Sequence, residues 1–330
     1  MSEILLARYA DGIFWNARYV ERAENLARIV DVTETFTRDT YGGQNWLSIV
    51  QLHSDETAFF ARHKTATPET VRHFYMLDAD NPTSVVSAIR FAHDNARALR
   101  PLISTEMWLQ LNVLQNWVSR LAPADIGPGR LNDLCRRIKE GCQTYTGITE
   151  GTFYRDQSWY FYEMGRYLER ADQTTRLLDM KYHLLLPRPS DVGSPIDVRQ
   201  WNALLRSAAG YHAYRKLHPR GMTPGQVAGF LLLNRQFPRS VYLCIRQIEL
   251  LLAELKARYG LRGGNRAAEQ LDSLRALLGT MSITEILAQG LHELLDLIQV
   301  RLIAITRDLS TAFFGYEPPP AETASAAEPQ

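Results

Sequence analysis

Hydrophobic residues recur along most of this chain at spacings of three and four, the pattern of one face of an α-helix. In the first long segment, Tyr19, Ala23, Leu26 and Val30 share such a face. No convincing series of alternating hydrophobic and polar residues, which would indicate half-buried β-strands, interrupts this pattern. We therefore predict an all-α fold with about six helices in each half of the chain.

One helical segment occurs twice. Residues 18–31 read RYVERAENLARIVD, and residues 166–179, which start 148 positions later, read RYLERADQTTRLLD. Seven of these fourteen positions are identical, and most of the others keep their chemical character. A second copy of a long polar and hydrophobic pattern indicates that the protein is built from two similar halves.

Matches outside this segment extend the repeat. At a spacing of 156 they are Thr67-Pro68 with Thr223-Pro224, Pro82-Thr83-Ser84-Val85 with Pro238-Arg239-Ser240-Val241, and Ile89-Arg90 with Ile245-Arg246. At a spacing of 160 they are Leu131, Leu134, Ile138 and Phe153 with Leu291, Leu294, Ile298 and Phe313. A slowly changing offset is what duplication with small loop insertions produces. We predict an internally duplicated helical bundle whose halves, residues 1–150 and 151–316, pack as one domain with pseudo-twofold symmetry.

Two kinds of helix start recur in both halves. Thr67 and Thr223 each precede a proline, so each threonine side chain can cap a helix whose first residue is proline. Pro82 and Pro238 are predicted to occupy similar first positions, where the missing backbone N–H costs little.

The composition of the join between the halves and of the last segment also predicts their structure. The join near residues 150–156 is short and close to several aromatic residues, which is unlike a flexible linker. Residues 317–330 are dominated by Pro, Ala, Glu and Ser and are too polar to bury. We expect this last segment to be a disordered tail.

The bulk composition is typical of a soluble globular protein, with 330 residues, 45% hydrophobic and 22% charged. A formal net charge of +1 offers no reason to expect nucleic acid or an anionic membrane as a partner. No hydrophobic run approaches the ~20 residues that a membrane helix needs, and residues 1–9 show no signal-peptide pattern. We therefore expect a cytoplasmic protein that binds neither nucleic acid nor membrane.

The cysteine and histidine residues predict no metal site. Cys135, Cys142 and Cys244 form no CxxC pair, and their odd number without a framework fits a reducing compartment. The eight histidines include no HExxH and no other spacing that is typical of metal ligands.

The repeated helices carry the most distinctive chemistry. Placed at 100° per residue, the side of the helix opposite its hydrophobic face gathers acidic, basic and amide side chains. In the first copy these are Arg18, Glu21, Arg22, Asn25 and Arg28, with Glu24 able to pair with Arg28. In the second copy they are Arg166, Glu169, Arg170, Gln173 and Arg176, with Asp172 able to pair with Arg176.

Four interpretations of these residues stay open. The simplest is a solvated face, on which each ion pair contributes only ~0.3–0.5 kcal/mol. The second is a buried ion-pair network where the two helices meet. The third is a pocket in which Glu21 and Glu169 receive an amine or act as acid and base, while arginines hold an anion. The fourth is a docking surface for a partner.

The candidate site follows from the last two interpretations. Its catalytic residues would be Glu21 and Glu169. Its anion-binding or partner-docking residues would be Arg18, Arg22, Glu24, Arg28, Arg166, Arg170, Asp172 and Arg176.

At residues 13–28, IFWNARYVERAENLAR, the sequence resembles the Alpha-E family of bacterial proteins, which is named for an all-helical domain with a Glu-Arg motif. Asn16-Ala17 stands where the family signature has Leu-Gly, and the second half supplies Met164-Gly165 at that place. The resemblance covers nearly the whole chain, to about Tyr316.

The resemblance implies a partner. Alpha-E proteins are typically encoded beside a circularly permuted ATP-grasp protein, often together with a transglutaminase-like protein. ATP-grasp enzymes join a carboxylate to an amine through an acyl phosphate, so ATP and Mg²⁺ would belong to the partner. This sequence contains no GxxxxGK[ST], GxGxxG or GxSxG motif of its own, and we expect no cofactor in this chain.

We therefore expect an accessory or substrate-handling subunit of an amide or peptide ligase system, with the Glu-Arg helices lining a central polar site. One alternative is a stand-alone transferase or hydrolase, in which Glu21 or Glu169 is a general base whose pKa is raised by burial. Another is a scaffold whose Glu-Arg residues only lock the halves together. Homo-oligomerisation also stays open.

Overall fold

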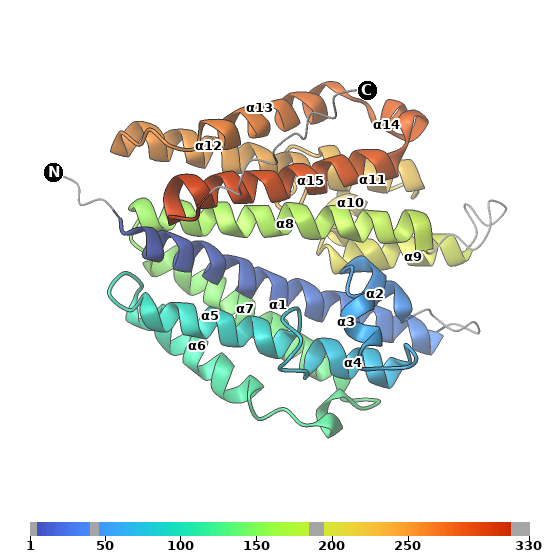
Figure 1. Cartoon of the computed structure of the whole chain (residues 1–330). Coiled ribbons are helices and arrows are strands. Elements are labelled where there is room, and N and C mark those ends of the chain that lie inside the picture. Colours follow the sequence, from blue (N-terminus) through green and yellow to red (C-terminus); the bar gives the residue numbers. More distant parts are fainter. Residues whose placement is uncertain (1–4, 40–45, 185–194, 318–330) are drawn as a thin grey trace, which may run out of the picture.

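The computed structural model describes residues 5–39, 46–184 and 195–317. Two long helices, α1 (Ala7–Asp39) and α8 (Gln157–Leu184), run side by side through the middle of the molecule (Figure 1). The remaining helices lie in two groups on either side of this pair. Every regular element in the described ranges is helical, so the predicted all-α fold is confirmed.

The first group follows α1 in the sequence and packs against it. Its elements are α2 (Leu47–Leu52), α3 (Glu56–Phe60), α4 (Pro68–Met76), α5 (Val85–Ala98), α6 (Thr105–Val118), the 3₁₀ helix η1 (Pro123–Ile126) and α7 (Leu131–Thr152). Helices α5 and α7 lie along α1, and α6 packs on both of them.

The second group follows α8 and repeats this arrangement of contacts. Its elements are α9 (Pro195–Ser207), α10 (Tyr211–Leu217), α11 (Pro224–Leu233), α12 (Val241–Tyr259), α13 (Asn265–Thr280), α14 (Ile283–Gln289), α15 (Leu291–Leu309) and the π-helical turn η3 (Ser310–Phe314). Helices α12 and α15 lie along α8, and α13 packs on both. Each group also touches the central helix of the other half, because α9 and η3 touch α1, and α2 touches α8.

The described ranges contain seven α-helices before the join and eight after it, so the expectation of about six in each half was too low. The additional elements are short helices of five to seven residues, such as α3 and α10. A helix of one or two turns shows too few repeats of the hydrophobic pattern to be recognised in a sequence.

The predicted threonine caps are confirmed. The Thr67 hydroxyl accepts a hydrogen bond from the backbone N–H of Thr70, and Thr223 accepts one from Gln226. In both helices proline occupies the first position, where its N–H is not needed.

The predicted role of Pro82 and Pro238 is wrong. The helices that follow them begin later, at α5 and α12, and their N-caps are Ser84 and Ser240. Each serine hydroxyl accepts a hydrogen bond from the N–H three residues ahead, which satisfies a donor that the helix leaves free. The prolines therefore lie in the turn before the helix.

The hydrophobic core is continuous from the first group through α1 and α8 to the second. The join between the groups is the short segment that the sequence predicts, since α7 ends at Thr152 and α8 begins at Gln157. Phe153 in this join is buried. The predicted disordered tail lies outside the described residues, apart from Glu317.

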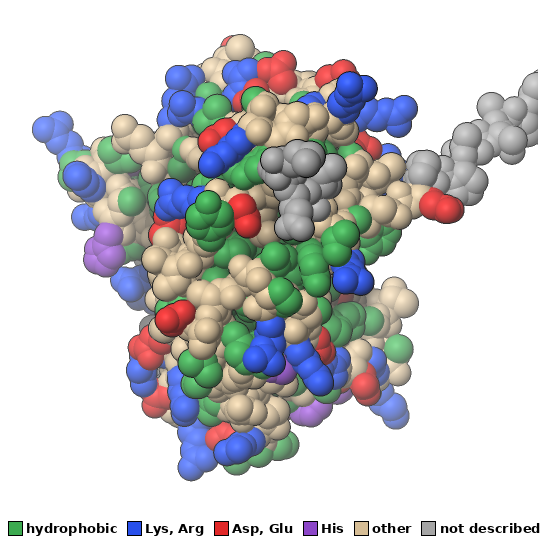
Figure 2. All heavy atoms as spheres, turned by 90° about the vertical axis from the view of Figure 1, so that its left-hand side faces the viewer, with side chains coloured by type: hydrophobic (Ala, Val, Ile, Leu, Met, Phe, Trp, Pro, Cys, Tyr) green, Lys and Arg blue, Asp and Glu red, His purple; other side chains and the backbone are tan. Residues whose placement is uncertain are grey.

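Figure 2 shows the end of the molecule at which α1 begins, where hydrophobic side chains lie in the middle of the face and charged side chains surround them. Leu6, Tyr154 and Tyr316 are exposed hydrophobic residues next to the helix ends gathered here. None of the described helices is both long and apolar enough to cross a membrane.

A glycine allows α1 and α8 to approach closely. A Cβ atom at Gly165 would lie 2.3 Å from the backbone oxygen of Phe14 on α1, which is far inside van der Waals contact. The matching position of α1 is Ala17, whose side chain is buried. The close contact of the two central helices therefore depends on the missing side chain of Gly165.

We expect Gly165→Ala to lower the free energy of unfolding by about 1–3 kcal/mol, because the new methyl group forces the two helices apart. Urea denaturation measures this change. The matched control is Gly147→Ala in α7, where a Cβ meets nothing within 4 Å. That control should be stabilising by about 0.5–1 kcal/mol, since alanine favours helix. Equal stability of Gly165→Ala and wild type would contradict the close approach.

Candidate functional site

The two motif carboxylates lie inside the molecule, each facing the opposite central helix. Glu169 of α8 is fully buried and is held by two arginines of α1. Arg18 Nε donates to Glu169 Oε2 at 2.8 Å, and Arg22 donates to Oε1 at 2.7 Å and to Oε2 at 3.0 Å. Gln173, one turn further along α8, adds a hydrogen bond of 3.3 Å.

Glu21 of α1 has a comparable set of partners, from α8, from the turn before α12 and from α1 itself. Arg170 Nε of α8 lies 3.0 Å from Glu21 Oε2, and Arg239 Nη1 donates to Oε1 at 2.5 Å. Asn25, one turn along α1, donates at 3.4 Å. The side chain of Glu21 is only 2% exposed. Each motif carboxylate is thus held by two guanidinium groups from outside its own helix.

We call Glu21, Glu169 and the arginines that pair with them the Glu-Arg cluster. Its two halves differ in the partner of one matching arginine, Arg18 in the first copy and Arg166 in the second. Arg166 occupies the position that Arg18 has in the first copy, but it pairs with Glu163 of its own helix. The residue that corresponds to Glu163 in α1 is Trp15, and the Arg18 guanidinium stacks 4.6 Å above its ring. Since Glu163 holds Arg166, the second cation on Glu21 is supplied by Arg239 instead.

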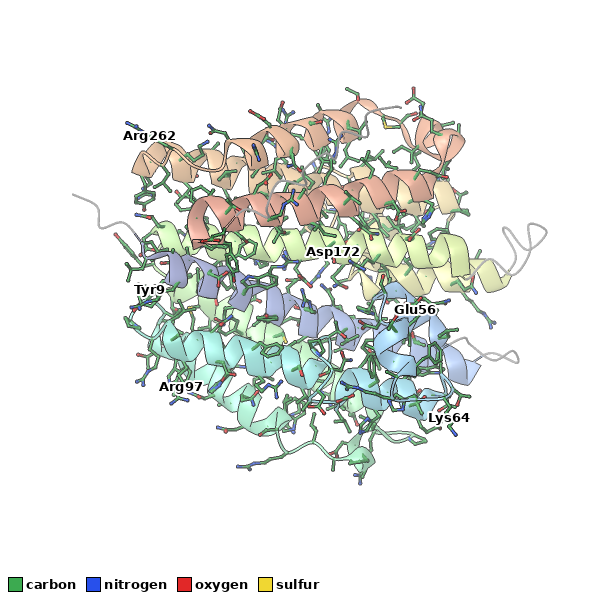
Figure 3. The ribbon with its side chains drawn as sticks, in the orientation of Figure 1. Tyr9, Glu56, Lys64, Arg97, Asp172 and Arg262 are labelled. Carbon is green, nitrogen blue, oxygen red and sulfur yellow. The ribbon has the colours of Figure 1, made fainter. Side chains whose placement is uncertain are left out.

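A second layer of acidic groups lies at the edge of the cluster. Glu24 accepts from Arg28 at 2.6 Å and from Arg239 at 3.1 Å. On α8, Asp172 accepts from Arg176 at 2.9 Å. In Figure 3, Asp172 lies on α8 near the middle of the molecule. Every candidate residue named from the sequence therefore takes part in an ion pair, but the pairs form separate sets: one around Glu169, one around Glu21 and Glu24, and the pairs Arg166–Glu163 and Arg176–Asp172.

The arginines decide the ionisation of the two motif carboxyls. Burial acts to raise the pKa of Glu21, but the charges of Arg170 and Arg239 outweigh it and lower this pKa to about 2. Burial opposes the ionised form of Glu169 as well, and Arg22 and Arg18 lower its pKa to about 2. Both carboxyls are consequently ionised throughout the physiological pH range.

These observations separate the interpretations of the motif. The solvated face is wrong, because Glu21 and Glu169 are buried. The general base of the stand-alone enzyme needs a raised pKa, whereas the pKa of each motif carboxyl is lowered. Burial does raise the pKa of Glu163, despite the charge of Arg166. The geometry matches the buried ion-pair network.

Two cavities adjoin the cluster, and three of the predicted site residues face them. The α15 cavity has a volume of about 320 Å³ and lies between α1, α8 and α15; its lining includes Trp15, Arg18, Asp172, Ile303 and Thr306. The α9 cavity has a volume of about 440 Å³ and lies between α1, α7, α9 and α10; its lining includes Arg28, Asp31, Lys139, Arg206, Tyr211 and His212. Glu21 and Glu169 line neither cavity.

Helices α8 and α15 bring together one further group of charged residues. Ligand atoms of Asp179, His292 and Asp296 all lie within 4.8 Å of one another, and His292 Nδ1 is 2.7 Å from Asp179 Oδ1. The sequence spacing gave no sign of this cluster, since Asp179 comes from α8, far from His292 and Asp296 of α15. Exposed acidic groups often gather in this way without a metal ion, so the cluster assigns no metal. The three cysteines are buried and unbonded, and burial raises the pKa of the Cys244 thiol to about 12.

Sequence reasoning missed Arg239, which lies outside the repeated helices. It occupies a short turn before α12 and contacts both Glu21 and Glu24. The signal was present in the repeat itself, because the matching residue of the first half is Thr83. A charged residue that departs from an internal repeat is a reasonable candidate for a contact that only one half makes.

We expect Glu169→Gln to lower the free energy of unfolding at pH 7 by about 3–5 kcal/mol, because it leaves the guanidinium groups of Arg18 and Arg22 buried without a carboxylate. Urea denaturation gives this value. The matched control is Glu140→Gln, which breaks an exposed pair with Arg136 and should cost about 0.5 kcal/mol or less. If both variants lowered the free energy of unfolding by similar amounts, the buried ion pairs would stabilise the fold no more than an exposed one does.

The same measurement should depend on pH. The pKa of Glu169 is about 2 in the folded protein and has its ordinary value of 4.5 when the chain unfolds. Its stabilising contribution is therefore complete above about pH 4.5 and is lost as the pH falls towards 2. The difference between wild type and Glu169→Gln should narrow over this range, and a difference that stays constant down to pH 3 would contradict the lowered pKa.

The chain matches a known protein family. The Alpha-E model, described as a predicted alpha-helical domain with a conserved ER motif, matches residues 5–314. Uncharacterized proteins of Mycobacterium bovis and Mycobacterium tuberculosis are 24% identical to this chain over 330 residues, which cover 92% of the chain and 36% of each relative. The chain thus spans about a third of the length of these curated relatives. No solved structure matches it.

The family match includes both helices of the Glu-Arg cluster and nearly all of the described residues. On this basis the chain belongs to the Alpha-E family.

Proposed function

We propose that this protein is a non-catalytic accessory or substrate-handling subunit that works in the cytoplasm with a circularly permuted ATP-grasp amide or peptide ligase. The observation that carries the proposal is the state of Glu21 and Glu169: both are buried, paired with arginines and ionised. Such carboxylates cannot readily accept a proton or reach a substrate. In this proposal the ligase supplies the ATP chemistry, and the Glu-Arg cluster holds the subunit in shape.

We propose that the Glu-Arg cluster joins two duplicated halves of the chain, which are related by a pseudo-twofold axis. Reciprocal ion pairs support this relation, since Arg22 of α1 holds Glu169 and Arg170 of α8 holds Glu21. A second pair of contacts also joins residues at matching positions of the two halves. Asn132 of α7 donates to Asp31 of α1, and the residues 160 and 148 positions later, His292 and Asp179, also contact each other.

The proposed docking surface for the ligase is a row of exposed hydrophobic residues on α15. Leu297, Val300 and Ile303 are 38%, 64% and 62% exposed, and their spacing of three places them on neighbouring turns. Ile303 also lines the α15 cavity, so the row leads to the edge of the Glu-Arg cluster. Exposed apolar residues that form a continuous row are typical of interaction sites.

The corresponding surface of α7 in the first half is polar, and this contrast supports the assignment of the docking surface to α15. Helix α7 carries Arg137, Glu140 and Gln143 at the positions that lie 160 residues before the row. One copy of the helix therefore has an ordinary polar surface where the other is apolar. The length of the mycobacterial relatives supports a protein partner as the occupant, because about two thirds of each relative lies outside the match to this chain.

We expect Glu21→Gln together with Glu169→Gln to retain product formation in the reconstituted subunit and ligase, provided that the assay runs below the lowered melting temperature of the variant. The reason is that both carboxylates act on folding rather than on the reaction. Product is measured with the ligase, ATP and its carboxylate and amine substrates. A folded double variant that forms no product would assign the carboxylates to the reaction and overturn the proposed role.

We expect Val300→Glu together with Ile303→Glu to abolish co-purification of the ligase with the tagged subunit, because the new charges must lose their water at the interface. The matched control is Leu250→Glu, which replaces a half-exposed hydrophobic residue of a different helix, α12. Melting temperatures of all variants should stay within a few degrees of wild type. Undiminished capture of the ligase by the α15 variant would rule out this surface.

A further inference from the structure

The α9 cavity is built by three parts of the chain that lie far apart in the sequence: α1, α7 and the consecutive helices α9 and α10. Helix α1 contributes Arg28 and Asp31, α7 contributes Lys139, and the turn from α9 into α10 contributes Arg206 and Tyr211. A volume of about 440 Å³ falls within the range of small-molecule sites, roughly 300–1,000 Å³. The cavity is therefore large enough for a small organic molecule.

The charges around this cavity are unequal. Its described lining holds three permanent cations, Arg28, Lys139 and Arg206, and a single carboxylate, Asp31. Asp31 is neutralised by Lys139, whose Nζ lies 2.6 Å away, and accepts a further hydrogen bond from Asn132. The cavity thus presents a net positive lining in which the acidic group is already occupied.

The pairing of the two arginines differs. Arg28 donates to Glu24 at 2.6 Å and is thereby tied to the edge of the Glu-Arg cluster. Arg206 is exposed, and no described carboxylate pairs with it. Its guanidinium stacks 4.6 Å above the ring of Tyr211. Stacking on an aromatic face fixes the plane of a guanidinium and leaves its N–H edge free for an acceptor.

We propose that the α9 cavity is a binding site for a small organic molecule with an oxyanion group, a phosphate or a carboxylate, and that Arg206 binds this group through its free N–H edge. A planar guanidinium suits both oxyanions, because two parallel N–H groups match two acceptor oxygens. Arg28 of α1 and Lys139 of α7 line the same cavity and add a positive field while they keep their own partners. The rest of the molecule fills the cavity beside Tyr211. This site does not depend on the ligase partnership.

Isothermal titration calorimetry of the full chain at low salt tests the site with three probes: inorganic phosphate, pyrophosphate and citrate. We expect saturable one-site binding of at least one probe, and the preferred probe tells phosphate from carboxylate recognition. Binding should weaken as salt is added. Arg206→Ala should weaken it by about tenfold or more, the loss expected for a charge-assisted hydrogen bond, and Arg206→Lys should retain part of the affinity.

The matched control is Arg215→Ala on α10, which removes the same charge from an exposed residue that is absent from the described lining. It should change the affinity less than twofold, and both alanine variants should keep the wild-type melting temperature, since both side chains are exposed. Failure of all three probes to bind, or equal affinities of Arg206→Ala and wild type, would overturn the proposal. An equal loss in Arg215→Ala would mean non-specific attraction and would overturn it as well.

Discussion

The structure depends on the burial of two carboxylates between α1 and α8. Taking an ionised glutamate out of water is costly, and the cost is offset only if cations and hydrogen bonds surround it in good geometry. Glu169 meets this condition through Arg18 and Arg22, and Glu21 meets it through Arg170 and Arg239. Both sets cross between α1 and α8, and Arg239 adds a contact from the turn before α12. The same interactions that keep the carboxylates ionised therefore hold the two groups in a fixed relation.

The cluster also shows how a repeated sequence adapts to unequal surroundings. In the first copy Trp15 supports Arg18 from one side and leaves its donors to the partner helix. In the second copy Arg166 pairs with Glu163, and it therefore does not pair with Glu21. A cation from the turn before α12, Arg239, replaces it. Glu163 stands where α1 has Trp15, and Arg239 stands where the first half has Thr83, so the two positions that distinguish the surroundings of Glu21 lie 76 residues apart.

A rigid centre of this kind leaves the periphery free to differ. Helix α15 is apolar where α7 is polar, and the two cavities beside the cluster have different linings. The α15 cavity combines Trp15 and aliphatic residues with two arginines and Asp172, and the α9 cavity has three cations and one carboxylate. Function is therefore proposed at the edges, where Arg18, Asp172 and Arg28 reach the cavities, rather than at the buried glutamates. This division agrees with the pKa values, since Glu21 and Glu169, whose pKa values are lowered to about 2, line neither cavity.

Local sequence determined the helical class, the threonine caps, the short join at residues 150–156 and the pairing of Glu24 with Arg28, because each depends on residues within a few positions of one another. The repeat offered a meeting of the two Glu-Arg helices as one of four open interpretations. Only the tertiary structure decided that Glu21 and Glu169 are buried, that their pKa values fall rather than rise, and that Arg239 joins them. It alone brought Arg206 to the same cavity as Arg28. The physical reason is that burial and charge at one point are set by every helix that packs there, and those helices are separated by long stretches of chain.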